Sequence, residues 1–180
     1  MQQSNRPGRV TDPAQCRART LGPVGIAVFD IDGVVADVRH RVHHVEQYPQ
    51  DWGSFFDAAA ADPPSAEGVE WALKATADHE LVWLTGRPEW LRPVTSRWLA
   101  AQGLPVERLI MRGNRDYRPA RDYKVAELRK LAATAEIAVF VDDDPAVINA
   151  AAGAGFTASL ATWLPRGEAL ADAQERAGRT

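Results

Sequence analysis

The stretch IAVFDIDG at residues 26–33 decides the fold of this chain. Its first four residues, 26–29, are apolar and predict a buried strand. Asp30, Asp32 and Gly33 end that strand abruptly, because aspartate and glycine favour turns over extended backbone. We therefore expect a buried strand that carries two carboxylates into a turn at its carboxyl end.

Short apolar strands and amphipathic helices alternate along the chain from this stretch onward. We predict further strands at residues 81–84, 108–111, 137–141 and 156–160. We predict helices at residues 66–78, 88–102, 123–133 (capped by Asp122) and 146–152 (capped by Asp144). Such alternation is typical of βαβ units with right-handed crossovers. The predicted fold class is therefore α/β: a Rossmann-like three-layer sandwich with a central parallel sheet of about five strands.

The chain of 180 residues has room for one domain, because domains usually run ~100–200 residues. Residues 1–24 are polar and rich in Gly, Pro and Arg, which predicts a flexible N-terminal tail. We place the domain at residues 25–165 and a C-terminal tail at residues 166–180. Residues 37–64 mix histidines, aromatics and a double proline, so we expect a small helical cap inserted after the first strand.

Composition excludes several classes of protein. With 46% hydrophobic and 25% charged residues, the chain has the composition of a globular protein rather than a disordered one. A single cysteine, Cys16, allows no internal disulfide and no cysteine metal cage. No stretch reaches the ~18 apolar residues of a membrane span, and the N-terminus lacks the apolar core of a signal peptide. We therefore expect a cytoplasmic protein with no membrane partner.

The net charge of −3 hides an uneven distribution. Residues 87–130 hold 11 basic and 5 acidic residues, whereas the rest of the chain holds 10 basic and 19 acidic ones. An acidic chain with one arginine-dense segment indicates a local anion site rather than a surface that binds polyanions everywhere. The alternative is that these arginines are solvated on helix faces.

Polar side chains follow three of the predicted strands. Asp30 and Asp32 come after the first strand, Thr85 after the second, and three aspartates at residues 142–144 after the fourth. In an open parallel sheet these carboxyl ends share one edge, where ligands bind. Several carboxylates together repel one another unless a cation lies among them, and oxygen ligands of this kind favour Mg²⁺. Lys124 can reach the same edge as a fixed positive charge.

This set of residues, in this order, resembles the haloacid dehalogenase superfamily of phosphotransferases. FDIDG (29–33) is similar to the first motif of that family, LTGR (84–87) to the second, Lys124 to the third and VDDD (141–144) to the fourth. The motifs span residues 26–160, about three quarters of the chain. A lone D-x-D is a weak signal, but four motifs in order, each at the end of an expected element, are specific.

The resemblance implies a phosphomonoester hydrolase that works through an aspartyl-phosphate. Asp30 is then the nucleophile, and Asp32 protonates the leaving oxygen and later deprotonates water. Thr85 donates a hydrogen bond to a phosphoryl oxygen, and Lys124 neutralises Asp30 and the phosphoryl group.

The resemblance also implies a Mg²⁺ cofactor. Its ligands are then Asp30, the main-chain carbonyl of Asp32, and Asp142, with Asp143 in the first or second shell of ligands.

The substrate is predicted from the size of the cap and from the arginines. A small cap leaves the site open to the end of a macromolecule, and arginines offer phosphate contacts beside it. The substrate-binding candidates are Gly86, Arg87, Arg112, Arg115 and Arg118. The segments 85–87, 109–124 and 141–148 are moreover similar to the 3′-phosphatase domain of phage-type polynucleotide kinases. No Gly-Lys dipeptide occurs, so any kinase partner must be a separate chain.

Several alternatives stay open. The substrate can instead be a free nucleotide or another small phosphoester, and a rival from another class is a phospho-accepting signalling receiver domain. His40, His43 and His44 suit a zinc site if they share a helix face, although no carboxylate-rich pattern accompanies them. Residues 52, 55 and 56 are aromatic with helical spacing, which predicts the core of the cap, with base stacking as the alternative.

Overall fold

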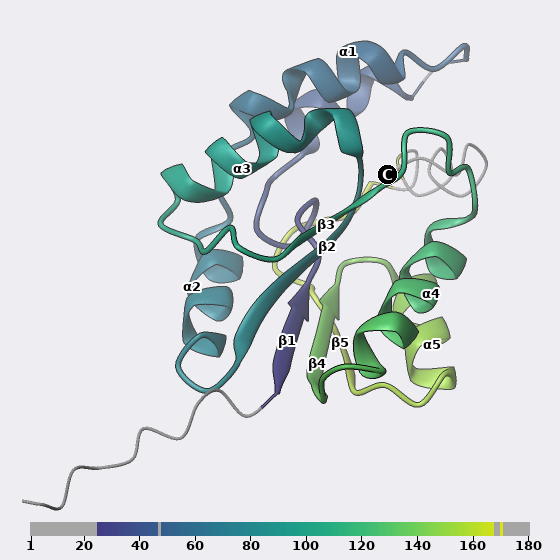
Figure 1. Ribbon diagram of the computed structural model, residues 1–180. Coiled ribbons are helices and arrows are strands. Elements are labelled where there is room, and N and C mark those ends of the chain that lie inside the picture. Colours follow the sequence, from purple (N-terminus) through teal and green to yellow (C-terminus); the bar gives the residue numbers. More distant parts are fainter. Residues whose placement is uncertain (1–24, 47, 168–169, 171–180) are drawn as a thin grey trace, which may run out of the picture.

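The computed structural model describes residues 25–46, 48–167 and 170, and the predicted N-terminal tail at residues 1–24 lies outside them. Five parallel strands form one sheet with helices on both faces (Figure 1), which confirms the predicted fold class. The strands are β1 (Ile26–Phe29), β2 (Glu80–Pro88), β3 (Leu109–Arg112), β4 (Ile137–Asp142) and β5 (Ala158–Leu160).

The helices follow the strands in the predicted alternation. The α-helices are α1 (Trp52–Asp57), α2 (Ala66–Ala75), α3 (Arg92–Ala101), α4 (Ala120–Ala132) and α5 (Pro145–Gly153). Short 3-10 helices are η2 (Arg39–His44), η3 (Ala58–Ala61) and η4 (Glu89–Leu91). None of the helices in the described part of the chain has the length and apolar character of a membrane span.

Two predicted helix starts are wrong. Pro88 ends β2 instead of opening α3, because β2 resumes pairing with β3 at Pro88–Arg112 beyond an irregularity in the register. The N-cap of α4 is Pro119 rather than Asp122, which lies in the first turn of the helix. A carboxylate in the first turn still favours the helix, because the N-terminal end of the helix dipole is positive. The predicted cap of α5 is confirmed: Asp144 Oδ1 accepts a hydrogen bond from the Ala146 amide at 2.8 Å.

Side chains alternate between the two faces of the sheet, as successive residues of a strand must. In β1, Ala27 and Phe29 belong to the hydrophobic cluster beneath α1, α2 and α3. Ile26 and Val28 belong to the cluster that packs against α4 and α5. Figure 1 shows the two groups of helices on opposite sides of the sheet. Burial on both faces explains why these strands consist of continuous apolar runs.

The strand order is β3-β2-β1-β4-β5. The chain therefore moves outward from β1 through β2 to β3 and then returns to the other side of β1 at β4. Ligands of open α/β sheets bind at such a switch point, outside the carboxyl ends of the strands. This order also contradicts the receiver-domain alternative, because flavodoxin-like receivers have the order 2-1-3-4-5.

The inserted segment 37–64 contains η2, α1 and η3, and it leaves and rejoins the domain at one point, because Ala36 bridges to Pro64. Its side chains Trp52, Phe55 and Phe56 are buried and contact one another edge-on or tilted.

The predicted C-terminal tail begins too early. Arg166 donates a hydrogen bond to Asp144 Oδ2 at 2.9 Å, and Leu170 is buried in the cluster beneath α1, α2 and α3. The apolar side chain and the ion pair hold both residues on the domain.

Candidate active site

Two aspartates and a lysine meet at the switch point of the sheet. Asp30 directly follows β1, Asp142 ends the neighbouring strand β4, and Lys124 lies in the first half of α4. Lys124 Nζ donates to Asp30 Oδ2 and to Asp142 Oδ2, both at 2.6 Å. All three side chains are buried, and this raises the strength of the ion pairs because water no longer screens them. The structure thus brings together three residues that the sequence predicts for the site.

A third carboxylate completes a group that can hold a cation. Ligand atoms of Asp30, Asp142 and Asp143 lie within 4.8 Å of one another. Burial and the neighbouring Asp142 raise the pKa of Asp30 to about 7, against the lowering effect of Lys124. Asp30 Oδ1 is buried and has no hydrogen-bond partner among the described residues. Clustered carboxylates with an unsatisfied oxygen fit a hard divalent cation such as Mg²⁺.

Gly33 allows the first motif to fold against these aspartates. Its φ of +75° lies in the left-handed region, and a Cβ atom there would lie 2.3 Å from Asp143 Oδ2. Both observations require glycine at this position.

Thr85 and Gly86 line the same cavity as Asp30, Lys124 and Asp142. Thr85 is buried, and its Oγ1 accepts a hydrogen bond from the Arg87 amide at 3.2 Å. The hydroxyl hydrogen can therefore point toward an incoming oxygen.

Asp32 belongs to a buried network of two carboxylates and two arginines. Asp32 Oδ1 accepts from Arg41 Nη2 and from Arg87 Nε, both at 2.9 Å. Asp62 accepts from Arg41 Nε at 2.7 Å and from Arg87 Nη2 at 2.6 Å. Arg41 and Arg87 have no exposed surface, and Asp62 and Asp32 are buried as well. The arrangement pairs two buried positive charges with two negative ones, as burial of ions requires.

The network determines the charge of Asp32. Burial alone would raise the pKa of Asp32, but Arg87 and Arg41 together lower it to about 2. Both arginines contact Oδ1, whereas Oδ2 has no hydrogen-bond partner among the described residues. Asp32 is therefore a carboxylate at neutral pH, and its Oδ2 is the oxygen that can take up a proton.

The prediction that Arg87 binds substrate needs correction. Its guanidinium is fully buried between Asp32 and Asp62, so it presents no surface to a substrate. Arg41 and Asp62 were not predicted at all. Both come from the inserted segment, where nothing in the sequence shows that a charged side chain will turn inward.

The remaining arginine candidates lie in different surroundings. Arg112 is buried, its guanidinium lies 4.5 Å from the centre of the Tyr123 ring, and its Nη1 donates to the carbonyl of Arg118 at 2.6 Å. Arg118 is exposed and forms an ion pair with Asp116. Arg115 is exposed. Acidic neighbours thus already offset part of the positive charge that the sequence places in this segment.

The histidines do not assemble a zinc site. Within the described residues, the one group of three metal-ligating side chains consists of Asp30, Asp142 and Asp143. His40 Nε2 instead lies 2.8 Å from Asp62 Oδ1, while the rings of His43 and His44 lie 3.9 Å apart, centre to centre.

The sheet order and the aspartates at the switch point define a Rossmann-like α/β protein with a carboxylate site. The structure is similar to a haloacid dehalogenase-like family hydrolase from Streptococcus pneumoniae, with a TM-score of 0.55 and 11% identity over 84% of this chain and 91% of that chain. The chain therefore has the haloacid dehalogenase-like fold.

Two further solved structures share this fold. One is a chain of the Pnkp1/Rnl/Hen1 complex, with a TM-score of 0.61 and 18% identity over 81% of this chain and 48% of that chain. The other is a class C acid phosphatase from Bacillus anthracis with tungstate bound, with a TM-score of 0.53 and 17% identity over 68% of this chain and 54% of that chain. The present chain spans about half the length of each of them. No family model and no curated protein matches its sequence.

Proposed function

We propose that the protein is a Mg²⁺-dependent phosphomonoester hydrolase that works through an aspartyl-phosphate on Asp30 and removes a terminal 3′ phosphate from a polynucleotide. The observation that carries the proposal is the buried contact of Lys124 with Asp30 and Asp142 at the switch point of the sheet. This contact places a carboxylate, a fixed positive charge and a candidate cation site within one small cavity.

Asp30 is the nucleophile of the proposed reaction. One of its carboxylate oxygens attacks phosphorus, the bond from phosphorus to the leaving oxygen breaks, and an aspartyl-phosphate forms. Lys124 holds one oxygen of Asp30 and stabilises negative charge as it moves onto the phosphoryl oxygens. Thr85 orients one of those oxygens through its hydroxyl group.

Asp32 transfers the protons. Asp32 takes a proton from the water that attacks the aspartyl-phosphate, which releases inorganic phosphate and free Asp30, and it gives this proton to the leaving oxygen of the next substrate. Arg41 and Arg87 stabilise the carboxylate form of Asp32, which is the form that accepts the proton from water. Oδ2 is the oxygen that carries the proton, since Oδ1 accepts from both arginines.

The carboxylates of Asp30, Asp142 and Asp143 are the side chains that hold Mg²⁺ in this proposal, together with the main-chain carbonyl of Asp32. The cation supplies positive charge that lets an anionic carboxylate approach an anionic phosphate.

The proposed substrate rests on the small cap and on the fold neighbours. The inserted segment contains a single six-residue α-helix and two 3-10 helices, which leaves room at the site for the end of a long molecule. The Pnkp1/Rnl/Hen1 complex is described as an RNA repair complex. In our proposal the present chain acts on nucleic-acid ends.

A substrate panel tests this proposal. We expect turnover of a 3′-phosphorylated oligonucleotide to exceed turnover of a 5′-phosphorylated oligonucleotide, a nucleoside monophosphate and a chromogenic phosphoester. Preference for the monophosphate would replace the polynucleotide end with a free nucleotide as substrate. Arg115→Glu tests the role of that exposed arginine in the same panel: a loss confined to the oligonucleotides supports a contact with the nucleic-acid backbone.

The variant Asp30→Asn tests the chemistry itself. The change keeps the size of the side chain but removes the nucleophile, so we expect turnover to fall at least 1,000-fold, on the order of the loss on removal of other covalent nucleophiles. Phosphate release is measured with circular dichroism as the control for folding. Turnover close to that of the unmodified protein would sink the proposed mechanism.

A further inference from the structure

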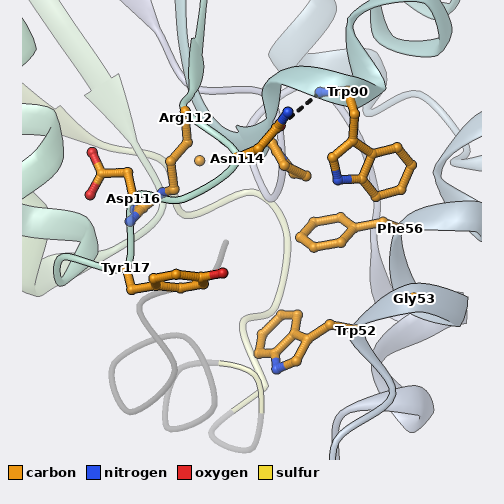
Figure 2. Close-up of a pocket in the computed structure, with 11 residues that line it drawn as sticks. Trp52, Gly53, Phe56, Trp90, Arg112, Asn114, Asp116 and Tyr117 are labelled. Carbon is orange, nitrogen blue, oxygen red and sulfur yellow. Dashed lines mark hydrogen bonds between the residues drawn. The ribbon is translucent and has the colours of Figure 1, made fainter.

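A pocket with aromatic walls adjoins the aspartate site. It has a volume of about 180 Å³ and is lined by four aromatic side chains, Trp52, Phe56, Trp90 and Tyr117. Figure 2 shows Trp52, Phe56 and Trp90 along one wall, and Arg112, Asp116 and Tyr117 along the other. The walls come from three separate parts of the chain: the inserted segment, the end of β2 with η4, and the loop after β3.

Gly86 joins this aromatic pocket to the proposed phosphate site. It lines the aromatic pocket and also the cavity that contains Asp30, Thr85 and Lys124. A molecule whose phosphate lies at Asp30 therefore has the aromatic pocket as its neighbour on the Gly86 side. A hydrogen bond connects the two walls of the pocket: the Trp90 amide donates to Asn114 Oδ1 at 3.0 Å. The pocket is formed before a ligand enters, as small-molecule sites usually are.

The aromatic rings have an exposure that folding does not explain. Trp90 is 50% exposed and Tyr117 is 56% exposed, although they line the same pocket as the buried Trp52 and Phe56. The rings of Phe56 and Trp90 meet edge to face at a centroid distance of 6.0 Å. This contact holds the Trp90 ring in place and leaves half of the side chain exposed. Aromatic faces left open beside a phosphate site are typical of proteins that stack the bases of single-stranded nucleic acids.

The polar end and the size of the pocket restrict which ligands it can hold. Arg112 and Asp116 line the polar end of the pocket, and Asp116 is also paired with Arg118, so this end offers guanidinium and carboxylate groups to the polar edge of a ligand. Pockets for drug-sized ligands have roughly 300–1,000 Å³, so a pocket of about 180 Å³ suits one flat ring system. A nucleobase is flat and polar at its edge, and it fits the aromatic walls, the size and the polar end of the pocket.

We propose that the aromatic pocket binds the nucleobase of the terminal nucleotide whose phosphate is removed at Asp30. This inference rests on the proposed function, and it adds that the enzyme recognises the terminal base of its substrate beside any phosphate contacts along the backbone. Stacking is tolerant of sequence, since every base has a π face. The pocket therefore selects nucleotides over other phosphoesters with little preference among bases.

The test compares two oligonucleotides that differ only in their last residue. Both carry a 3′ phosphate, on deoxyadenosine in one and on an abasic tetrahydrofuran residue in the other. We expect the unmodified protein to prefer the first about tenfold or more in kcat/KM, the fold-change that stacking of one base provides. Equal kcat/KM values for the two substrates would overturn the inference.

Variants of the two exposed aromatic residues test whether the pocket causes the preference for the substrate with a terminal base. Trp90→Ala and Tyr117→Ala should each reduce the preference toward one. Trp71→Ala is the matched control, because Trp71 is 43% exposed on α2, where its ring contacts Trp163 and does not line the pocket. This control should keep the full preference. Because the preference is a ratio of two rates, a variant that is partly unfolded does not mimic the effect. A preference unchanged in both pocket variants would contradict the inference.

A binding measurement separates the inference from the proposed function. Ligand-observed NMR with adenosine and with ribose detects base binding without any phosphate. If neither oligonucleotide is hydrolysed, the proposed function fails, and adenosine binding that Tyr117→Ala weakens still supports the pocket. If both are hydrolysed equally and adenosine does not bind, the pocket inference fails and the phosphatase stands.

Discussion

Asp62 shows how a single residue of the inserted segment supports the candidate site. Its carboxylate accepts hydrogen bonds from Arg41 and Arg87, the same two arginines that contact Asp32. Without Asp62, two buried guanidinium groups would share one carboxylate. An uncompensated buried charge is costly, because the low-polarity interior cannot replace the water that the charge has lost.

We predict that Asp62→Ala lowers the free energy of unfolding by about 3–5 kcal/mol, the usual cost of breaking a buried ion pair from one side. Urea unfolding followed by tryptophan fluorescence measures the change. Glu80→Ala is the control, because Glu80 pairs with Arg108 on the surface, where a pair contributes at most about 1 kcal/mol. Equal losses in the two variants would show that the buried network contributes no more than a surface pair.

At the residue scale, the sequence predicts the site where local pattern and topology are sufficient. Asp30 and Asp142 follow apolar runs, so their position at the carboxyl edge of the sheet follows from the strand pattern alone. Arg41 and Asp62 lie 21 positions apart in a segment without strong periodicity. Their contact depends on how the inserted helices pack against one another and against α3, which no local pattern in the chain specifies.

At the scale of elements, α2 packs closely against the loop after the first motif. Gly68 lies in α2, and a Cβ atom at this position would lie 1.9 Å from the carbonyl oxygen of Val34 and 3.0 Å from Trp163 Nε1. Trp163 Nε1 itself donates to that carbonyl at 2.7 Å. The absence of a side chain at Gly68 thus lets the helix, the loop and the C-terminal segment meet at one point.

The substitution Gly68→Ala has two opposite effects on the stability of the folded protein. Alanine favours a helix interior by about 1 kcal/mol over glycine, but the contact with Val34 forces backbone atoms apart. We expect the clash with Val34 to outweigh the gain in helix propensity, so that the midpoint of urea unfolding falls to a lower urea concentration. Gly153→Ala at the end of α5 is the matched control, since nothing lies within 4 Å of its Cβ position. It should be neutral or stabilising. A Gly68→Ala protein as stable as the control would show that α2 can shift without cost.

The end of β2 shows why the boundaries of some elements cannot be predicted from the local apolar pattern. The apolar run that identifies β2 stops at Leu84, whereas the strand continues through Thr85, Gly86 and Arg87 to Pro88. Pairing with β3 and the Asp32 contact of Arg87 hold these residues in place, and both interactions come from distant parts of the sequence. For the same reason the aromatic pocket, built from three segments, has no local signature.

At the scale of the whole molecule, the sheet concentrates negative charge at its switch point. Asp30, Asp142 and Asp143 face one lysine, Lys124, across a small cavity. The resulting repulsion is a cost that the folded protein bears and the unfolded chain does not. A cation that binds the folded state alone should therefore stabilise the protein by mass action.

We predict that Mg²⁺ raises the melting temperature, and does so more strongly at pH 8 than at pH 6. At a concentration of 100 times Kd the gain is about 2.7 kcal/mol, or roughly 5–10 °C for a chain of this size. The pH dependence follows from Asp30 and Asp143, because burial raises the pKa of Asp30 to about 7 and that of Asp143 to about 8. Below these values the carboxyl groups are protonated, and a metal must displace their protons to bind. The Mg²⁺ concentration for half of the shift should therefore fall as pH rises from 6 to 8.

Thermal unfolding by differential scanning fluorimetry at a series of Mg²⁺ concentrations measures this dependence. NaCl at matched ionic strength controls for screening of surface charge. Asp142→Ala should remove most of the shift, because it takes away one of the three carboxylates while Lys124 remains. A shift that is equal at pH 6 and pH 8 would show that neither Asp30 nor Asp143 binds the cation. A shift that survives Asp142→Ala would place the cation elsewhere on this acidic chain and leave the repulsion at the switch point balanced by Lys124 and by Arg166, which pairs with Asp143.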